Sequence, residues 1–151
     1  MFNTTIATQI YAKICFEATN SQKKIIENLS EYLSDDDFSR IFVLNGFAGT
    51  GKTTLIAALV AALKELRIKP VLLAPTGRAA KVLARYCGEQ ALTIHKRIYR
   101  QRTNADYESK FSLDFNREQG AVFIVDEASM LSDSTGDGAL FGSGSLLEDL
   151  V

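Results

Sequence analysis

The residues with the clearest chemical potential form the stretch Gly46-Phe47-Ala48-Gly49-Thr50-Gly51-Lys52-Thr53. It fits G-x-x-x-x-G-K-[ST], in which glycines let successive backbone N–H groups surround nucleotide phosphates. The lysine reaches the β- and γ-phosphates, and the last hydroxyl is a ligand for Mg²⁺. A plain glycine turn would not explain a lysine at a helix start, where the helix dipole disfavours a cation. We therefore expect a Mg–nucleotide site made by Gly46, Ala48, Gly49, Thr50, Gly51, Lys52, Thr53 and Thr54.

The segments on either side of this loop are of the types that the motif requires. Ile41–Leu44 is short, apolar and β-prone, and residues 54–63 are rich in helix formers. The order strand, glycine loop, helix is the context that supports a phosphate-binding loop. We predict a strand over Ile41–Leu44 and a helix that continues to about Leu66.

A second candidate group is the acidic pair Asp126-Glu127, which follows the apolar run Ala121–Val125. A continuous apolar run predicts a strand buried on both faces, and ligands of parallel sheets bind beyond the carboxyl ends of strands. Asp126 would then hold Mg²⁺, and Glu127 would orient or deprotonate the water that attacks the γ-phosphate. With Lys52, they form the expected catalytic set. The alternative is that the two acids only cap the next helix.

The remaining pattern predicts an α/β domain with a mainly parallel sheet, because strands alternate with helices. Thr19 and Gln22 have the spacing of a helix-starting capping box. A small hairpin is expected near Phe111–Phe115, where apolar and polar residues alternate. Other expected elements are helices over 5–16, 77–86, 92–99 and from Ser145 on, and a strand over Pro70–Ala74.

Composition narrows the class of protein. The 151 residues are 46% apolar and 23% charged, a balance typical of globular domains. No apolar run is long enough to span a membrane, and the first residues do not resemble a secretory signal, so we expect a cytoplasmic protein without a membrane partner. Cys15 and Cys87 match no metal spacing and are expected to be thiols. Because few strands are visible before the glycine-rich residues 136–144, we interpret the chain as an N-terminal fragment.

Charge is unevenly distributed, although the net charge is only −1. Lys64–Lys110 contains eleven Lys/Arg and four Asp/Glu, whereas the rest of the chain contains six and fourteen. Such a basic segment is either a footprint for a phosphate backbone or a solvated surface with scattered positive charge. Charge alone does not separate the two.

Several motifs in order resemble one family. Gly46–Thr53 and Val125-Asp126-Glu127-Ala128-Ser129-Met130 have the form of the Walker A and Walker B motifs, which many nucleotide hydrolases share. Ala74–Lys81, reading Ala-Pro-Thr-Gly-Arg-Ala-Ala-Lys, and Thr93-Ile94-His95 are more discriminating. The set resembles the N-terminal motor domain of superfamily 1B, RecD-like DNA helicases. The resemblance implies a RecA-like P-loop domain, partial here, over residues 19–151, after an N-terminal extension over 1–18.

The resemblance also implies roles for particular residues. Gln22 would read the adenine edge, although its capping-box spacing gives a structural alternative. Residues that would contact single-stranded DNA are Pro75, Thr76, Gly77, Arg78, Thr93 and His95. His95 could instead be a partly buried structural histidine. Residues 99–119 occupy the place of a small β-hairpin insertion, in which Tyr107 and Phe111 would either stack on bases or form a minor core.

The sequence thus predicts part of an ATP-dependent DNA helicase or translocase that binds Mg–ATP and single-stranded DNA. The family's γ-phosphate sensor and second motor domain do not occur in these residues, so we expect weak hydrolysis and no unwinding by the chain itself. The alternative is a P-loop ATPase switch or binding module with no nucleic-acid role.

Overall fold

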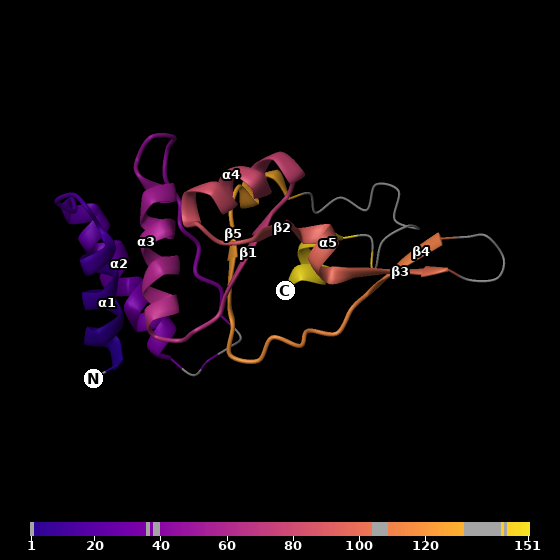
Figure 1. Ribbon diagram of the computed structural model, residues 1–151, viewed down its shortest axis with the longest axis horizontal. Helices are drawn as coiled ribbons and strands as arrows, with labels where there is room; N and C mark the ends of the chain where they lie inside the picture. Colours follow the sequence, from indigo (N-terminus) through magenta and orange to yellow (C-terminus); the bar gives the residue numbers. More distant parts are fainter. Residues whose placement is uncertain (1, 36, 38–39, 104–108, 132–142, 144) are drawn as a thin grey trace. The chain divides into compact units, whose positions relative to one another are not determined.

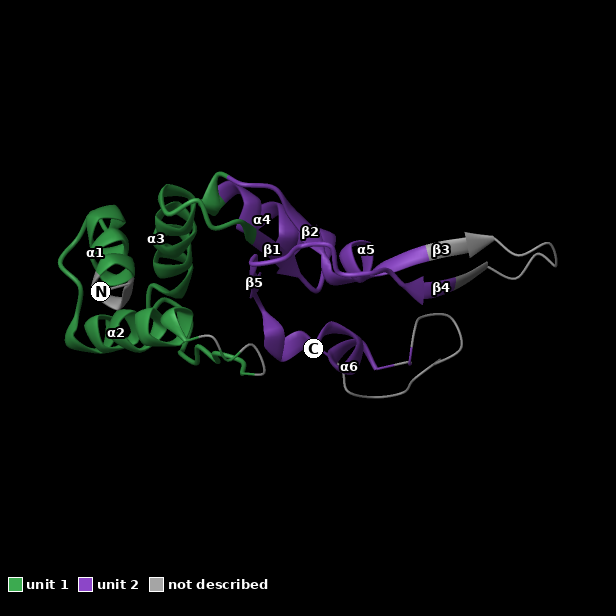
Figure 2. Ribbon diagram, turned by 90° about the horizontal axis from the view of Figure 1, so that it is seen from below, with its two compact units in different colours: residues 1–70, 86–88 green, residues 71–85, 89–151 purple. Residues whose placement is uncertain are grey.

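The computed structural model describes residues 2–35, 37, 40–103, 109–131, 143 and 145–151. The chain divides into two compact units, coloured separately in Figure 2. Unit 1 comprises residues 1–70 and 86–88, and unit 2 comprises residues 71–85 and 89–151. The phosphate-loop motif belongs to unit 1, whereas the acidic pair and the DNA-contact motifs belong to unit 2.

Unit 1 is built from three helices, α1 (Phe2–Lys13), α2 (Asn20–Ser34) and α3 (Lys52–Glu65). Helix α1 packs against both of the others (Figure 1). Its Ile6 and Ile10 side chains are fully buried, as their helical spacing predicts. Lys13 at its end forms an ion pair with Glu65 of α3, with 2.5 Å between the charged atoms. The helix from Lys52 on is confirmed, and the helix predicted over 5–16 is present but covers Phe2–Lys13.

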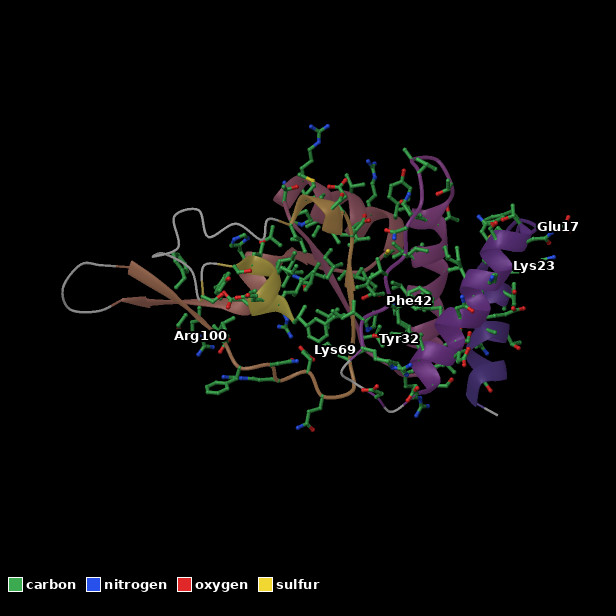
Figure 3. All side chains as sticks on the ribbon, turned by 180° about the vertical axis from the view of Figure 1, so that it is seen from behind. Glu17, Lys23, Tyr32, Phe42, Lys69 and Arg100 are labelled. Carbon is green, nitrogen blue, oxygen red and sulfur yellow. The ribbon has the colours of Figure 1, made fainter. Side chains whose placement is uncertain are left out.

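The expected strand over Ile41–Leu44 is wrong, because the structure has no strand there. The side chains of Ile41 and Val43 are 62% and 70% exposed. The segment lies against α2 instead: the centroids of the Tyr32 and Phe42 rings are 5.5 Å apart, and the Tyr32 hydroxyl donates to the carbonyl of Arg40 at 2.9 Å. Both aromatic residues are labelled in Figure 3. Apolar, β-prone residues form a strand only where a neighbouring strand satisfies their backbone groups.

Unit 2 is organised by a three-stranded sheet of β1 (Pro70–Ala74), β2 (Ala91–Thr93) and β5 (Val122–Val125), in the order β2-β1-β5. Strands β1 and β2 pair in parallel, and helix α4 (Gly77–Cys87) connects them. The predicted fold class is confirmed: the chain is α/β with a parallel three-stranded sheet and flanking helices, consistent with a RecA-like P-loop domain. The predictions for β1 and α4 also agree with the structure.

Two details of the sheet differ from expectation. Two residues of β2, Leu92 and Thr93, were expected to belong to a helix over 92–99, but the helix here, α5, covers only Ile94–Ile98. Strand β5 lies at the edge of the sheet, and its Phe123 side chain is 37% exposed, so the expected burial of this strand on both faces is wrong. An apolar run cannot distinguish a central strand from an edge strand.

The other described residues of unit 2 include a hairpin and two short helical segments. Strand β3 (Tyr99–Thr103) pairs antiparallel with β4 (Ser109–Leu113), and this hairpin continues directly from α5 (Figure 1). A 3-10 turn, η1, covers Ala128–Met130, and helix α6 covers Leu146–Leu150. Residues 136–142 of the expected glycine-rich loop lie outside the described residues.

Helix α6 covers one face of the sheet. Its Leu146 and Leu150 pack on a buried cluster of Val71, Leu73 and Ile94, so α6 contributes to the apolar core of unit 2. Among the described helices, none is long and apolar enough to cross a membrane.

Candidate nucleotide-binding loop and strand-end residues

The backbone of the loop in unit 1 depends on its glycines. Gly49 and Gly51 have φ values of +78° and +82°, in the left-handed region that favours glycine. A Cβ on Gly46 would stand 3.0 Å from the Thr50 hydroxyl oxygen, so this position is also crowded. Helix α3 begins directly after Gly51, and no side chain caps its first turn. The loop therefore has the backbone form, and the helix start, of a phosphate-binding site.

The Lys52 side chain forms hydrogen bonds with the backbone of its own loop. Its Nζ atom donates to the carbonyl oxygens of Gly46 at 2.5 Å and Phe47 at 2.7 Å. The carbonyl of Phe47 also accepts from the Thr50 hydroxyl at 2.8 Å. The ammonium of Lys52 is thus held by neutral acceptors that a phosphate, as a charged acceptor, can replace with stronger hydrogen bonds.

Thr53 and Thr54 follow Lys52 in the first turn of α3. Thr53 is half-buried and Thr54 is exposed. The Thr53 hydroxyl is an oxygen donor, which is the ligand chemistry that Mg²⁺ prefers. Ala48, in the middle of the loop, is exposed.

Gln22 lies against the loop and also caps α2. Its Oε1 atom accepts from the Thr19 backbone N–H at 2.9 Å, while the Thr19 hydroxyl accepts from the Gln22 N–H at 3.3 Å. This is a complete capping box, as the spacing predicted. The amide nitrogen of Gln22 lies 3.5 Å from the Thr50 carbonyl oxygen. The Gln22 side chain therefore performs the capping role and also contacts the loop, and its reading of adenine stays a prediction.

In unit 2, several predicted site residues gather at the carboxyl edge of the sheet. Thr93, the last residue of β2, is the register partner of Ala74, the last residue of β1. On the other side of β1, the Asp126 N–H donates to the Leu73 carbonyl at 3.0 Å. Because Thr93 and Asp126 lie on the two sides of the end of β1, the geometry brings the acidic pair and a DNA-contact motif to the same edge.

The acidic pair has an unusual backbone. Glu127 has a φ of +53°, which for a residue with a side chain costs about 1–3 kcal/mol. The Asp126 carboxylate supports this turn, because its Oδ1 atom accepts from the Glu127 N–H at 3.0 Å. The Glu127 side chain is exposed and makes no capping hydrogen bond to η1. The Glu127 side chain therefore does not cap η1.

The threonines of the DNA-contact motifs have structural partners. The Thr76 hydroxyl accepts from the Ala79 N–H in the first turn of α4, and the Thr93 hydroxyl accepts from the Lys96 N–H in α5, both at 3.2 Å. Between them, these two caps fix the starts of both helices at the carboxyl edge of the sheet. Arg78, in the first turn of α4, is exposed. Pro75 lies with Thr76 in the turn between β1 and α4, and Gly77 is the first residue of α4.

The structure gives the burial and some contacts of His95 and of one aromatic residue of the hairpin. The His95 ring lies 5.7 Å from the Tyr99 ring, and His95 is half-buried. Phe111 on β4 is half-buried, and Tyr107 lies outside the described residues. Their proposed contacts with bases stay predictions.

Comparison with known protein families shows the family to which the chain belongs. A protein-family model described as an AAA domain matches residues 17–140. The chain belongs to this AAA domain family. The matched residues include the loop motif Gly46–Thr53, the two predicted DNA-contact motifs and the acidic pair.

Two characterised proteins are similar to this AAA domain. The ATP-dependent RecD2 DNA helicase of Deinococcus radiodurans is 29% identical over 114 residues, covering 76% of the chain and 15% of the helicase. The ATP-dependent DNA helicase dda of Enterobacteria phage T4 is 37% identical over 92 residues, covering 58% of the chain and 20% of the helicase. The chain thus spans no more than about a fifth of the length of these relatives. The resemblance to superfamily 1B helicases is confirmed.

The sequence did not predict two contacts of the AAA domain. The Tyr99 hydroxyl donates to the Asp149 carboxylate at 2.5 Å, which joins the start of the hairpin to α6. Burial raises the pKa of Tyr99, and this hydrogen bond raises it further by a smaller amount. The second is the contact of Lys52 with the loop carbonyls. The Tyr99–Asp149 contact has no local signal, because the two residues are 50 positions apart, whereas the Lys52 contacts lie within the loop motif itself.

Proposed function

We propose that the chain is part of the first motor domain, over residues 19–151 after an N-terminal extension, of an ATP-dependent DNA helicase or translocase. The observation that carries this proposal is the loop of unit 1, with left-handed Gly49 and Gly51 directly before Lys52 and α3. Its support is the family match and the printed functions of two relatives, both ATP-dependent DNA helicases.

The nucleotide would be Mg–ATP, with its phosphates held by the loop N–H groups and by Lys52. The ammonium would exchange the carbonyls of Gly46 and Phe47 for phosphate oxygens, which form stronger charge-assisted hydrogen bonds. Thr53 and Asp126 have the oxygen donors that Mg²⁺ requires, and the ion would neutralise phosphate charge. Glu127 would orient the attacking water, a role supported by its exposed side chain and by the motif order of the family.

Single-stranded DNA would be bound by the carboxyl edge of unit 2. Arg78 is exposed in the first turn of α4, and the Thr76 and Thr93 caps hold two helix starts near it along the sheet edge. Arginine and helix N-termini bind phosphate without reading sequence. The expected affinity is therefore independent of sequence and falls steeply with salt.

A second candidate is a P-loop ATPase switch without a nucleic-acid role. The observation that favours it is that Thr76, Thr93 and His95 already have structural partners within unit 2. For this candidate, the DNA-contact motifs would serve only to hold α4 and α5 on the sheet.

The nucleotide half is tested with Lys52→Ala and Glu127→Gln. Lys52→Ala removes the only loop side chain with a positive charge, and we expect loss of Mg–ATP binding with an unchanged circular dichroism spectrum. Glu127→Gln should keep Mg–ATP binding, because the carboxylate acts on water rather than on the phosphates. Tight Mg–ATP binding by Lys52→Ala would refute the placement of the phosphates.

The DNA half is tested with Arg78→Ala, measured by fluorescence anisotropy with a labelled oligo(dT) at several salt concentrations. Arg85→Ala is a matched control, because Arg85 is an exposed arginine at the other end of α4. We expect Arg78→Ala to weaken binding several-fold and to reduce the salt slope by about 1, as for one lost phosphate contact. Equal effects of the two variants, or no binding by the unaltered chain, would favour the ATPase switch.

A further inference from the structure

Both the oxygen and the nitrogen of the Gln22 side-chain amide contact backbone groups. Its oxygen accepts from the Thr19 N–H at 2.9 Å, within the capping box of α2. Its nitrogen lies 3.5 Å from the carbonyl oxygen of Thr50. The capping box fixes the rotamer of the side chain, and this fixes the position at which the amide meets the loop.

A second observation shows how closely the amide approaches the loop. A Cβ on Gly51 would stand 2.9 Å from the Gln22 amide nitrogen, closer than real Cβ atoms approach other groups. Gly51 also has a φ of +82°. The backbone conformation of Gly51 therefore favours glycine, and the Gln22 amide lies directly beside this last glycine of the loop.

The contact reaches the part of the loop that would face phosphate. Thr50, whose carbonyl meets Gln22, donates its hydroxyl to the carbonyl of Phe47 at 2.8 Å. The same Phe47 carbonyl accepts from the Lys52 ammonium at 2.7 Å. A chain of contacts thus runs from the start of α2, through Gln22 and Thr50, to the group that holds Lys52.

We propose that Gln22 is a positioning residue for the phosphate loop, fixed by the Thr19 capping box and acting on phosphate binding whatever base the ligand carries. This inference rests on the proposed function only in that the loop binds phosphates. It differs from adenine reading, in which Gln22 would contribute nothing to a ligand without a base. A ligand without a base therefore separates the two roles.

The experiment measures the affinities of Mg–ATP and magnesium tripolyphosphate for the chain by isothermal titration calorimetry. Gln22→Met keeps the length of the side chain but lacks the amide donor and acceptor. Thr19→Ala removes the hydroxyl that accepts from the Gln22 N–H and so loosens the start of α2, but it keeps the Thr19 N–H that donates to the Gln22 amide oxygen. We expect each variant to weaken both ligands by the same factor, about two- to tenfold, as for one lost hydrogen bond. Thr19→Ser keeps the capping hydroxyl and should restore both affinities. Ser21→Ala, a neighbouring exposed position, is the matched control and should change neither affinity.

Two outcomes would overturn the positioning role. Loss of Mg–ATP affinity with unchanged tripolyphosphate affinity in Gln22→Met would show that the residue reads the base. Unchanged affinity for both ligands in Thr19→Ala would show that the cap does not support the loop. Far-ultraviolet circular dichroism confirms that each variant is folded at the assay temperature. If the unaltered chain bound neither ligand, the proposed function itself would fail, and this is distinct from either outcome.

Discussion

Two short apolar segments, Ile41–Leu44 and Pro70–Ala74, look alike in sequence and differ in the structure. Pro70–Ala74 forms β1, the central strand of the sheet, and its last four side chains are buried. Ile41–Leu44 forms no strand, and Ile41 and Val43 are largely exposed. The difference lies in what surrounds each segment, because β1 has a strand on either side, whereas residues 41–44 pair with no strand among the described residues.

These two segments show that β-propensity reflects how well side chains pack on the surface of a sheet, and not a preference of the backbone alone. The backbone groups of β1 are satisfied by β2 and β5, and its Leu73 is covered by Leu146 and Leu150 from α6. Each substitution below tests one side of this contrast.

The largest effect is expected for Leu73→Ala in β1. Leu73 is fully buried in the cluster that includes Val71 and Ile94, so its truncation should lower the free energy of unfolding by about 2–5 kcal/mol. Urea unfolding followed by circular dichroism measures this loss. Leu113→Ala is a matched control, because Leu113 is 47% exposed on the hairpin. Equal losses in the two variants would mean that the cluster around Leu73 is not the core of unit 2.

The next effect concerns the helix that covers β1. Tyr99→Phe removes the donor to Asp149, and a hydrogen bond to a charged group contributes about 1.5–3 kcal/mol. Unfolding of this variant at pH 7 should show that loss. Tyr86→Phe, at a position that is 64% exposed, should show none.

The same bond predicts a dependence on pH. Partial burial acts to raise the pKa of Asp149, but hydrogen bonds from Tyr99 and Ser143 outweigh it and lower the pKa below 3.8. The contribution of Asp149 to stability is therefore complete above that value and is lost as the pH falls through the folded pKa. The pKa of Tyr99 is raised above 10.0, so its contribution is lost only as the pH rises beyond that value. The difference in the free energy of unfolding between Tyr99→Phe and the unaltered chain should become smaller at both low and high pH. A constant difference down to pH 2 would mean that the Tyr99–Asp149 hydrogen bond does not make this contribution.

Much of this architecture could be predicted from sequence where the signal is local. The capping box of Thr19 and Gln22, the loop before Lys52 and the strand over Pro70–Ala74 each depend on neighbouring residues, and the structure contains all three. The failed strand over Ile41–Leu44 and the missed strand β2 depend on pairing with distant residues. The left-handed Glu127 and the Tyr99–Asp149 bond likewise follow from packing, which no window of sequence contains.

A smaller effect is expected where Ile41–Leu44 meets α2. Tyr32→Phe keeps the ring beside Phe42 but removes the hydroxyl that donates to the Arg40 carbonyl, so we expect a loss of about 0.5–1.5 kcal/mol. Hydrogen exchange at the amides of residues 41–44 should become faster in this variant. Unchanged exchange would mean that some contact other than the Tyr32 hydroxyl holds the segment.

The smallest effect is expected for Val43→Lys, and it is the most direct test of the contrast. Val43 is 70% exposed, and a surface substitution outside a packed core changes stability by about 0.5 kcal/mol or less. The same change at Leu72 in β1, which is 2% exposed, would bury an unpaired charge and should prevent unit 2 from folding. If Val43→Lys instead lowered the free energy of unfolding by more than about 2 kcal/mol, as expected for burial of an unpaired polar group, Ile41–Leu44 would be a buried strand and the two segments would not differ. A small change would show that strand formation here requires a partner strand, and not apolar sequence alone.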